Sequence, residues 1–225
     1  TLCCVARILE EGAGWFARRG NQPSAGTKVL SVSGDCLRPG VYELPFGIAL
    51  EELLGLVGAE SVAAVQVGGP SGKLVPPAQF GRKICFEDLA TGGSIMVFGA
   101  GRDLLDVARQ FMDFFVEESC GYCTPCRAGN VLLRERLERV IEGNAGPEDL
   151  DYLKELGESV KLASRCGLGQ TSPNPVLCTL ESFRPLYEAR LKKNASGLKP
   201  TFDIHKALEQ AKAVTGRDSV HFRKG

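Results

Sequence analysis

The chain has 225 residues, of which 44% are hydrophobic and 24% are charged, an ordinary balance for a globular protein of one or two domains. Lysine plus arginine and aspartate plus glutamate each number 27, so no net charge would draw the chain to nucleic acid or to an anionic membrane. No apolar run approaches the roughly 18 residues that a membrane span needs, so we predict no span.

Residues 1–26 are predicted to be a helical tail. The pattern is amphipathic and runs into "RRGNQPSAG", a polar linker rich in glycine, proline and serine. The chain starts at Thr1 inside this helical pattern and without a methionine. We therefore expect it to be a fragment of a larger protein, with residues 1–26 as the tail of a preceding domain.

Residues 27–101 change to a strand-like pattern. The β-rich runs "TKVLSVSG" and "GVYELPFG" are joined by a turn at Pro39-Gly40, and "IALEELLGLVG" has helical spacing with Gly58 as its expected C-cap. The runs "SVAAVQVGG", "KLVPP", "KICFEDL" and "GSIMVFG" follow. This order predicts a compact α+β unit that resembles a β-grasp.

Residues 102–194 are predicted to be helical. Asp103 is the expected cap of the first helix, and Thr124 and Pro125 are the expected N-cap and first residue of the second. A glycine-rich break before Pro147 starts a third helix, and "VLCTLESFRPLYEARLKK" is the fourth. Short connections between four helices predict a small bundle.

A C-terminal extension over residues 195–225 is expected to follow the bundle. It contains one further helical stretch, "DIHKALEQAKAV", which we expect to lie on the surface.

Nine cysteines, an odd number, argue against a secreted disulfide framework. They favour a reducing, cytoplasmic compartment in which thiols are free or bound to metal. Cys36 and Cys85 lie in strand-like runs, and Cys178 lies on an apolar helix face. We predict that these three thiols pack in the core rather than bind a ligand.

The remaining pattern is a candidate metal site. In "ESCGYCTPCRAGN", Cys120, Cys123 and Cys126 follow one another at three-residue intervals, and Cys166 lies in "ASRCGLGQTSPNPV". Thirty-nine residues separate Cys126 from Cys166, about the length of two antiparallel helices, so the bundle would return Cys166 to the loop. This is the ligand pattern of a [4Fe–4S] cluster. Zinc and unliganded thiols remain the alternatives.

These cysteine segments carry a family resemblance. "ESCGYCTPCRAGN" and "SRCGLGQTSPNP" closely resemble the cluster-binding segment of the NADH-binding flavoprotein subunit of respiratory complex I, the 51 kDa type. The forms "CRAGN" and "CGLGQTSPNP" resemble its soluble relatives more closely. These are the diaphorase subunit of NAD-reducing nickel–iron hydrogenase and the β-subunit of NAD-dependent formate dehydrogenase.

The resemblance extends over nearly the whole chain and implies a domain order. Residues 1–26 resemble the end of the flavin domain. "KVLSVSGDCLRPGVYELPFG" resembles the soluble-ligand-binding β-grasp (SLBB) domain, which implies that domain for residues 27–101. Residues 102–194 resemble the helical domain that binds the [4Fe–4S] cluster.

The resemblance also implies a function. In the parent oxidoreductase NADH reduces FMN, and this region passes single electrons to downstream iron–sulfur clusters. Cys120, Cys123, Cys126 and Cys166 are the implied ligands of a [4Fe–4S] cluster, Gly167 and Leu168 are implied neighbours of FMN, and no catalytic residue is implied. Implied partners are other subunits of the complex, of the iron–sulfur and 24 kDa types.

Two function classes therefore remain. The glycine-rich segments that bind FMN and NAD(H) in the family are not found in these residues, so we expect this chain alone not to oxidise NADH. The first class is electron transfer within an NADH dehydrogenase or diaphorase. The second is a structural or subunit-docking module in which a zinc or iron site holds the bundle together without a redox role.

Overall fold

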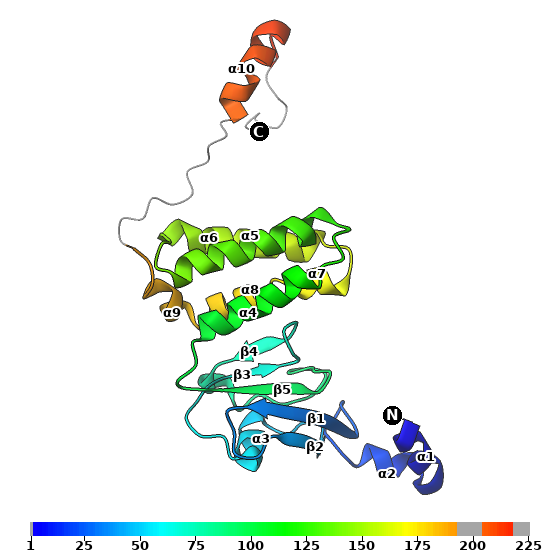
Figure 1. Cartoon of the computed structure of the whole chain (residues 1–225). Coiled ribbons are helices and arrows are strands. Elements are labelled where there is room, and N and C mark those ends of the chain that lie inside the picture. Colours follow the sequence, from blue (N-terminus) through cyan, green and yellow to red (C-terminus); the bar gives the residue numbers. More distant parts are fainter. Residues whose placement is uncertain (1, 193–203, 218–225) are drawn as a thin grey trace.

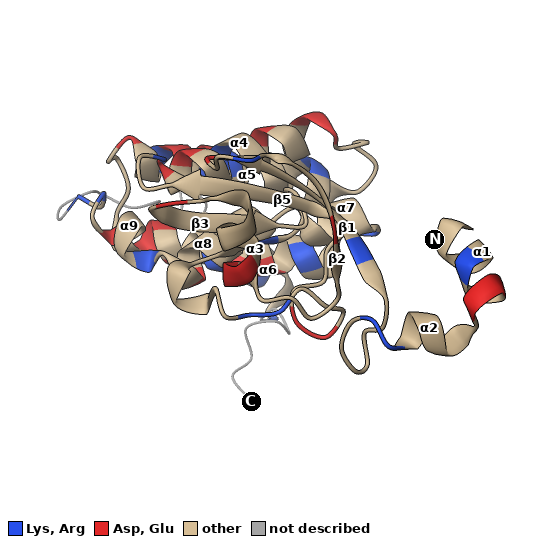
Figure 2. Ribbon diagram, turned by 90° about the horizontal axis from the view of Figure 1, so that it is seen from below, with Lys and Arg blue, Asp and Glu red and all other residues tan. Residues whose placement is uncertain are grey.

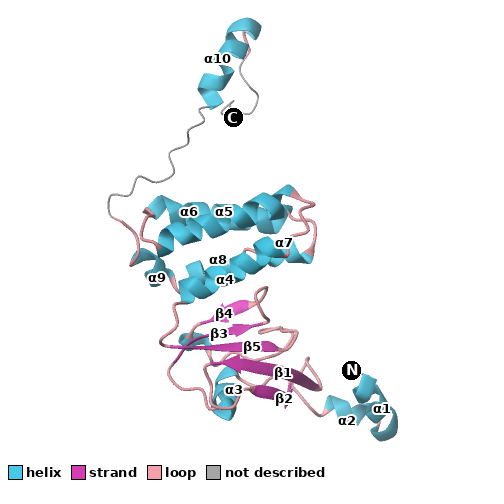
Figure 3. Ribbon diagram, viewed as in Figure 1, coloured by secondary structure: helices cyan, strands magenta, loops and turns pink. Residues whose placement is uncertain are grey.

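The computed structural model describes residues 2–192 and 204–217 and has an α+β architecture (Figure 1). A mixed five-stranded sheet is followed along the chain by a layer of helices, and the two lie face to face (Figure 3). The sheet packs against α3 on one face and against the start of α4 and part of α8 on the other. The predicted α+β class is therefore confirmed.

The predicted helical tail consists of two short helices rather than one. These are α1 (Leu2–Glu11) and α2 (Ala13–Ala17), which are separated at Gly12. Neither helix buries a residue against the rest of the described chain. The amphipathic pattern of α1 therefore leaves Leu2 and Leu9 exposed.

The sheet unit is built from a hairpin, a helix, a second hairpin and a last strand. Its elements are β1 (Thr27–Gly34), β2 (Gly40–Pro45), α3 (Leu50–Val57), β3 (Val62–Val67), β4 (Lys73–Val75), the 3-10 helix η1 (Pro77–Gln79) and β5 (Ser94–Gly99). The strand order is β2-β1-β5-β3-β4, with β1 parallel to β5 and all other neighbours antiparallel. The last strand therefore lies in the middle of the sheet.

The core of this unit lies between the sheet and α3. Alternating residues of β1 set the faces, because Leu30 and Val32 are buried while Val29 is exposed. Helix α3 buries one side and ends at Gly58, whose backbone is left-handed (φ 64°, ψ 46°) and whose N–H donates to the Gly55 carbonyl. Gly58 is thus the C-cap that the sequence predicts.

The run "KICFEDL" (83–89) is not a strand, contrary to the sequence prediction. Lys83 makes only an isolated bridge to Ala49, and the Asp88 carboxylate accepts a hydrogen bond from the Lys83 backbone N–H, 2.9 Å away. The apolar residues Ile84 and Leu89 are nevertheless buried in the core of the sheet unit. Residues at apolar positions of this run are therefore buried without forming a strand. The hydrogen bond from the Lys83 backbone to the Asp88 side chain uses an N–H group that strand pairing would need.

The two cysteines expected in strands lie outside them. Cys85 is in this same loop and is buried, which confirms its predicted packing role. Cys36 follows β1 in a turn and is half-buried against the core of the sheet unit.

The helical unit contains four longer helices that share one hydrophobic core. Its elements are α4 (Leu104–Glu117), α5 (Thr124–Ile141), α6 (Pro147–Ala163), α7 (Gly167–Thr171), α8 (Asn174–Ser182) and α9 (Arg184–Glu188). The predicted fourth helix is divided, because α8 ends at Phe183 and Pro185 opens α9. Proline cannot continue the backbone ladder of α8, so the chain turns there.

The end of the chain is described only in part. The predicted helix "DIHKALEQAKAV" is present as α10 (Ile204–Thr215), and residues 209–217 are exposed. The predicted boundary between residues 194 and 195 lies outside the described residues. Within residues 2–192 and 204–217, no helix is both long and apolar enough to cross a bilayer.

Asp103 caps α4 and ties it to the end of the helical unit. Its carboxylate accepts hydrogen bonds from the backbone N–H groups of Leu105 and Asp106, which confirms the predicted N-cap of α4. The other carboxylate oxygen accepts from Arg190 Nη2 at 2.7 Å, beyond α9. The start of the first long helix is thereby tied to the end of the last short one.

Charged residues of both signs are interspersed along the helices in the view of Figure 2. One ion pair differs from the others because it is buried: Arg136 of α5 pairs with Asp149 of α6, and their side chains are 8% and 0% exposed. Asp149 also accepts from the Gly146 backbone N–H at 2.8 Å, and the Arg136 guanidinium lies over the Tyr152 ring, 4.5 Å from its centroid. This network fixes the turn between α5 and α6.

We predict that Asp149→Ala lowers the free energy of unfolding by about 3–5 kcal/mol, because it leaves the Arg136 cation buried without its partner. The matched control is Glu188→Ala, which breaks the exposed pair with Arg184 and costs under about 1 kcal/mol. Urea denaturation of both variants measures the difference. Equal losses would contradict the assignment of Asp149 as a stabilising residue.

Candidate metal centre

The three clustered cysteines extend from the loop after α4 into the first turn of α5. The sequence prediction of the helix start is off by one residue, since the N-cap is Cys123 (φ −101°, ψ 135°) and Thr124 and Pro125 are already inside α5. Cys123 has an extended backbone, so its side chain stands at the N-terminus of α5. Cys126 lies one turn further on, on the buried face of the helix.

The structure brings the segment of Cys166 back beside this loop. Helices α5 and α6 pack against each other, α6 ends at Ala163, and Cys166 is the N-cap of α7. The neighbouring Arg165 donates a hydrogen bond to Tyr122 Oη at 2.9 Å, and its guanidinium lies over the Tyr122 ring, 4.9 Å from the centroid. Residues 43 positions apart therefore join the two cysteine segments.

The four thiols are graded in burial. Cys126 is buried, Cys123 is half-buried, and Cys120 and Cys166 are exposed; all nine cysteines of the chain are free of disulfides. Among the described residues, no group of three or more histidine, cysteine, aspartate or glutamate side chains is arranged to hold a metal ion. A zinc ion needs its ligands to meet at one point, about 2.3 Å from each sulfur, whereas a cubane takes one thiolate at each of four irons. The four cysteines are thus not arranged around a single ion in this structure.

The sulfur of Cys126 is surrounded by hydrogen-bonding groups. Asn130 Nδ2 donates to Cys126 Sγ at 3.4 Å, and Ser119 Oγ lies 3.3 Å from the same sulfur. Asn130 is 0% exposed and is held from its other side by Ser172, whose Oγ lies 2.7 Å from Asn130 Oδ1. The Cys126 sulfur is therefore buried but still has an N–H donor and a hydroxyl within hydrogen-bond distance.

The thiol of Cys123 has a pKa below its ordinary value. The first cause is the backbone N–H of Arg165, and the second is the backbone N–H of Cys126 in the first turn of α5. Both groups donate toward the sulfur and favour its anionic form. The contact with Arg165 also places Cys123 directly against the segment that carries Cys166.

Packing beneath the two segments leaves no room for a larger residue at position 169. A Cβ added to Gly169 would lie 2.6 Å from both Cβ and Oγ of Ser164 and 3.1 Å from Cys126 Cβ. The Ser164 hydroxyl is buried, and it is one of the smaller causes of the lowered pKa of the Cys123 thiol. A buried hydroxyl and backbone N–H groups close to Cys123 and Cys126 suit a group with several sulfur acceptors, as an iron–sulfur cluster has.

The predicted neighbours of FMN, Gly167 and Leu168, lie at the surface of α7. Gly167 is exposed and Leu168 is half-buried. Open space surrounds the α-carbon of Gly167, because no atom lies within 4 Å of the position that a Cβ would take. Nothing within the described chain requires glycine at position 167.

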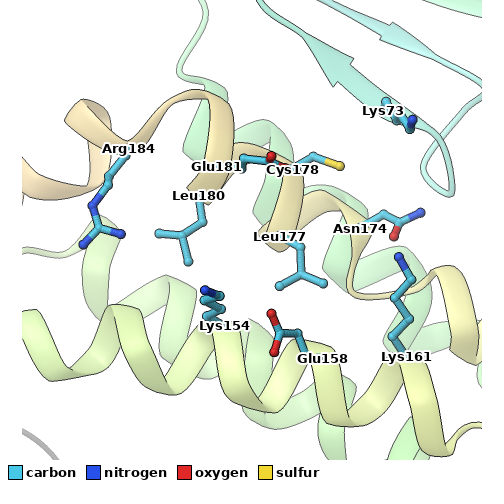
Figure 4. Close-up of a pocket in the computed structure, with 10 residues that line it drawn as sticks. All are labelled: Lys73, Lys154, Glu158, Lys161, Asn174, Leu177, Cys178, Leu180, Glu181 and Arg184. Atoms are coloured by element: carbon cyan, nitrogen blue, oxygen red, sulfur yellow. The ribbon is translucent and has the colours of Figure 1, made fainter. Parts of the chain in front are cut away.

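A separate cleft of about 670 Å³ lies between α6, α8 and β4 (Figure 4). It contains none of the four predicted ligands. Four basic side chains (Lys73, Lys154, Lys161 and Arg184) and two acidic ones (Glu158 and Glu181) line it. Cys178, predicted as a packing residue, is half-buried at its wall, and burial raises the pKa of its thiol.

The sequence interpretation missed the polar groups around the sulfurs. Asn130, Ser164 and Ser172 are all buried, although their residue types are usually exposed. A signal was present for Asn130, which stands four residues after Cys126 and hence on the same side of the predicted helix. Ser164 and Ser172 follow α6 and α7 and reach the cysteines only through the folding of these helices against α5. No local sequence pattern indicates their position.

Comparisons with known proteins agree with this geometry. Residues 106–190 match the family described as the NADH-ubiquinone oxidoreductase-F iron-sulfur binding region. The NAD-reducing hydrogenase HoxS subunit alpha of Cupriavidus necator is 50% identical over 209 residues, which are 92% of this chain and 35% of that protein. An NADH-quinone oxidoreductase subunit of Mycobacterium bovis is 32% identical over 202 residues, or 85% of this chain and 45% of that protein.

A third relative and a solved structure complete the comparison. The NADP-reducing hydrogenase subunit HndC of Solidesulfovibrio fructosivorans is 40% identical over 203 residues, 85% of this chain and 41% of its own length. A chain in the crystal structure of NAD⁺-reducing [NiFe]-hydrogenase in the H₂-reduced state superimposes with a TM-score of 0.82 and 39% identity. It covers 100% of this chain and 40% of its own length. The chain thus spans between a third and a half of each of these relatives.

We predict that Gly169→Ala destabilises the chain by about 1–3 kcal/mol, because the new methyl group must displace Ser164 or Cys126. Gly167→Ala is the matched control in the same short helix, and its effect stays within about 0.5 kcal/mol. Urea denaturation of the metal-free chain measures both. A Gly169→Ala variant as stable as the control would show that the packing under Cys126 is loose.

We also predict that alkylation of Cys123 in the metal-free chain reaches half its maximal rate at a lower pH than that of an ordinary thiol, whose pKa is about 8.5. Only the thiolate reacts, so a lowered pKa shifts the rise in rate to lower pH. Iodoacetamide labelling followed by peptide mass spectrometry measures this rate, with glutathione in the same reaction as the standard. A rise at or above the pH of the standard would contradict the arrangement of N–H donors around Cys123.

Proposed function

We propose that this chain, which belongs to the NADH-binding flavoprotein subunit family, holds a [4Fe–4S] cluster with Cys120, Cys123, Cys126 and Cys166 and thereby relays single electrons. The observation that carries the proposal is the meeting of two segments. The loop before α5 and the N-cap of α7 are joined by Arg165, which contacts Tyr122 and Cys123. In the parent oxidoreductase the electrons come from FMN reduced by NADH and go to downstream iron–sulfur clusters.

When bound, the cluster exchanges one electron at a time, which complements a flavin that receives hydride as an electron pair. The residues of this chain supply the ligands and their surroundings. Cys123 is favoured as a thiolate first by the backbone N–H of Arg165 and then by that of Cys126, and Asn130 donates a hydrogen bond to the Cys126 sulfur. Ser164 adds a buried hydroxyl beside Cys123, which would supply a further donor to a bound cluster.

Gly167 and Leu168 are proposed to face FMN. They follow the fourth cysteine directly, and both are accessible on α7. The space beside Gly167 supports this assignment, since packing within the described chain does not explain a glycine there. A flat ring placed against this backbone would explain it, because glycine permits the closest approach.

The sheet unit is proposed to be the SLBB β-grasp domain of the family. The order β2-β1-β5-β3-β4 with α3 after the first hairpin supports this, and so does its position before the helical unit. The proposed domains keep the boundaries 27–101 and 102–194, between the end of a flavin domain at 1–26 and an extension at 195–225. Other subunits of a multi-subunit NAD-linked oxidoreductase are the proposed partners, of iron–sulfur and 24 kDa type. Free thiols favour the cytoplasm as the compartment.

We expect this chain to take up about four iron and four sulfide per chain under anaerobic loading, and to become brown. Cys126→Ser loses most of both, because it removes the one ligand already buried in α5. Cys178→Ser is the matched control and keeps the wild-type content, since Cys178 lies in the other cleft. Iron, zinc and acid-labile sulfide assays measure these contents.

A colourless wild-type chain with one zinc and no sulfide would overturn the proposal. It would favour the structural or subunit-docking module with a metal staple instead. A Cys178→Ser variant that also fails to load would show that the four-cysteine assignment is wrong.

A further inference from the structure

One buried polar side chain lies directly beside the cysteines. Asn130 of α5 is 0% exposed, and its side-chain amide contacts Cys126 at one end and Ser172 at the other. Burying a carboxamide is costly unless both its donor and its acceptor are satisfied. Its surroundings therefore indicate what the amide does.

The orientation of the amide is set when the Ser172 hydroxyl donates to Asn130, the nearer of its two acceptors, rather than to the Gly169 carbonyl at 3.0 Å. Ser172 Oγ lies 2.7 Å from Asn130 Oδ1, and Ser172 is itself 0% exposed. A hydroxyl can donate to the oxygen end of an amide, so the –NH₂ end is directed to the opposite side. On that side Asn130 Nδ2 lies 3.4 Å from Cys126 Sγ.

We infer that Asn130 is a positioning residue that donates an N–H to the Cys126 thiolate and raises the reduction potential of the cluster which Cys126 helps to hold. The inference rests on the proposed function. Reduction adds one negative charge to the cluster and its thiolates, and a hydrogen bond to sulfur strengthens as that charge grows. In a buried site the effect is larger than in water.

Asn130 and Ser119 approach the same sulfur in different surroundings. Ser119 Oγ lies 3.3 Å from Cys126 Sγ but is only half-buried. Water can replace its hydroxyl, whereas no water from solvent reaches the place of the Asn130 amide. The loss of Asn130 therefore changes the reduction potential more than the loss of Ser119 does.

The test is Asn130→Leu in this chain after anaerobic cluster loading. Ser172 keeps a partner in this variant, because the Gly169 carbonyl oxygen lies 3.0 Å from its Oγ. We expect the equilibrium constant for one-electron reduction to fall about tenfold, a shift of about −59 mV. Redox titration followed by electron paramagnetic resonance measures the potential, and iron and sulfide assays measure the loading.

Two further variants make the result specific. Ser172→Ala frees the amide to turn without touching the sulfur, so the potential falls in the same direction by a smaller amount. Thr179→Val is the matched control: it removes a buried hydroxyl that bonds Tyr187 Oη at 2.6 Å, near α9. Figure 1 shows α7 and α9 at opposite ends of the helical layer, so Thr179→Val lowers stability and leaves the potential unchanged.

The outcomes separate this inference from the proposed function. Loaded Asn130→Leu with the wild-type potential overturns the inference and leaves the proposed function intact. If Asn130→Leu does not load, Ser172→Ala decides, and a wild-type potential in that variant overturns the inference. A wild-type chain that takes up no iron and sulfide overturns both. A shift of equal size in Thr179→Val would show that loosened packing, rather than the N–H donor, sets the potential.

Discussion

The matched lengths of α5 and α6 are the constraint on which the cysteine centre depends. The two helices have 18 and 17 residues, or about 27 and 26 Å at 1.5 Å per residue, so a chain that leaves Cys126 along α5 returns to the same level along α6. The two helices pack closely at Gly129, where an added Cβ would collide with the Val160 side chain. The buried pair of Arg136 and Asp149 then fixes the turn at the far end. An insertion or deletion in either helix would move Cys166 away from the loop.

The sheet unit and the helical unit are held together at two places. The Asp35 carboxylate accepts two hydrogen bonds from the Arg102 guanidinium and one from the Gly99 backbone N–H, so the chain is held where β5 gives way to α4. These bonds hold the pKa of Asp35 well below its ordinary value, with the Arg102 side chain as the largest cause. Asn174 at the start of α8 donates to the Ser71 carbonyl at 2.6 Å, in the turn before β4. The helices are thus oriented by the sheet from two separate places.

Local patterns in the sequence predicted the elements whose causes are themselves local. Gly58 ends α3 and Asp103 begins α4 as expected, because a left-handed cap and a side-chain cap depend on a few adjacent residues. "KICFEDL" was predicted wrongly because apolar alternation reports burial, and here a loop is buried. The start of α5 was displaced by one residue, since Thr124 is a better capping type than cysteine but Cys123 has the extended backbone.

The cysteine spacing predicted which segments meet, but not the polar groups around the sulfurs. Ser164 and Ser172 reach the site only because α6 returns and α7 turns back over it, and no short-range pattern encodes such a meeting. No short-range pattern predicts the separate cleft between α6, α8 and β4 either, because its side chains come from β4, α6, α8 and α9.

The order of the four cysteines along the chain has a consequence for how the protein is made. Cys120, Cys123 and Cys126 are synthesised close together, and 39 residues separate Cys126 from Cys166, which is about 2–8 s of synthesis at roughly 5–20 residues per second. During that interval the nascent chain carries three of the four proposed ligands, and α6 has not yet formed to bring Cys166 beside them. If these four cysteines hold the proposed cluster, its ligand set is complete only after α6 and the start of α7 have been synthesised and α5 and α6 have paired.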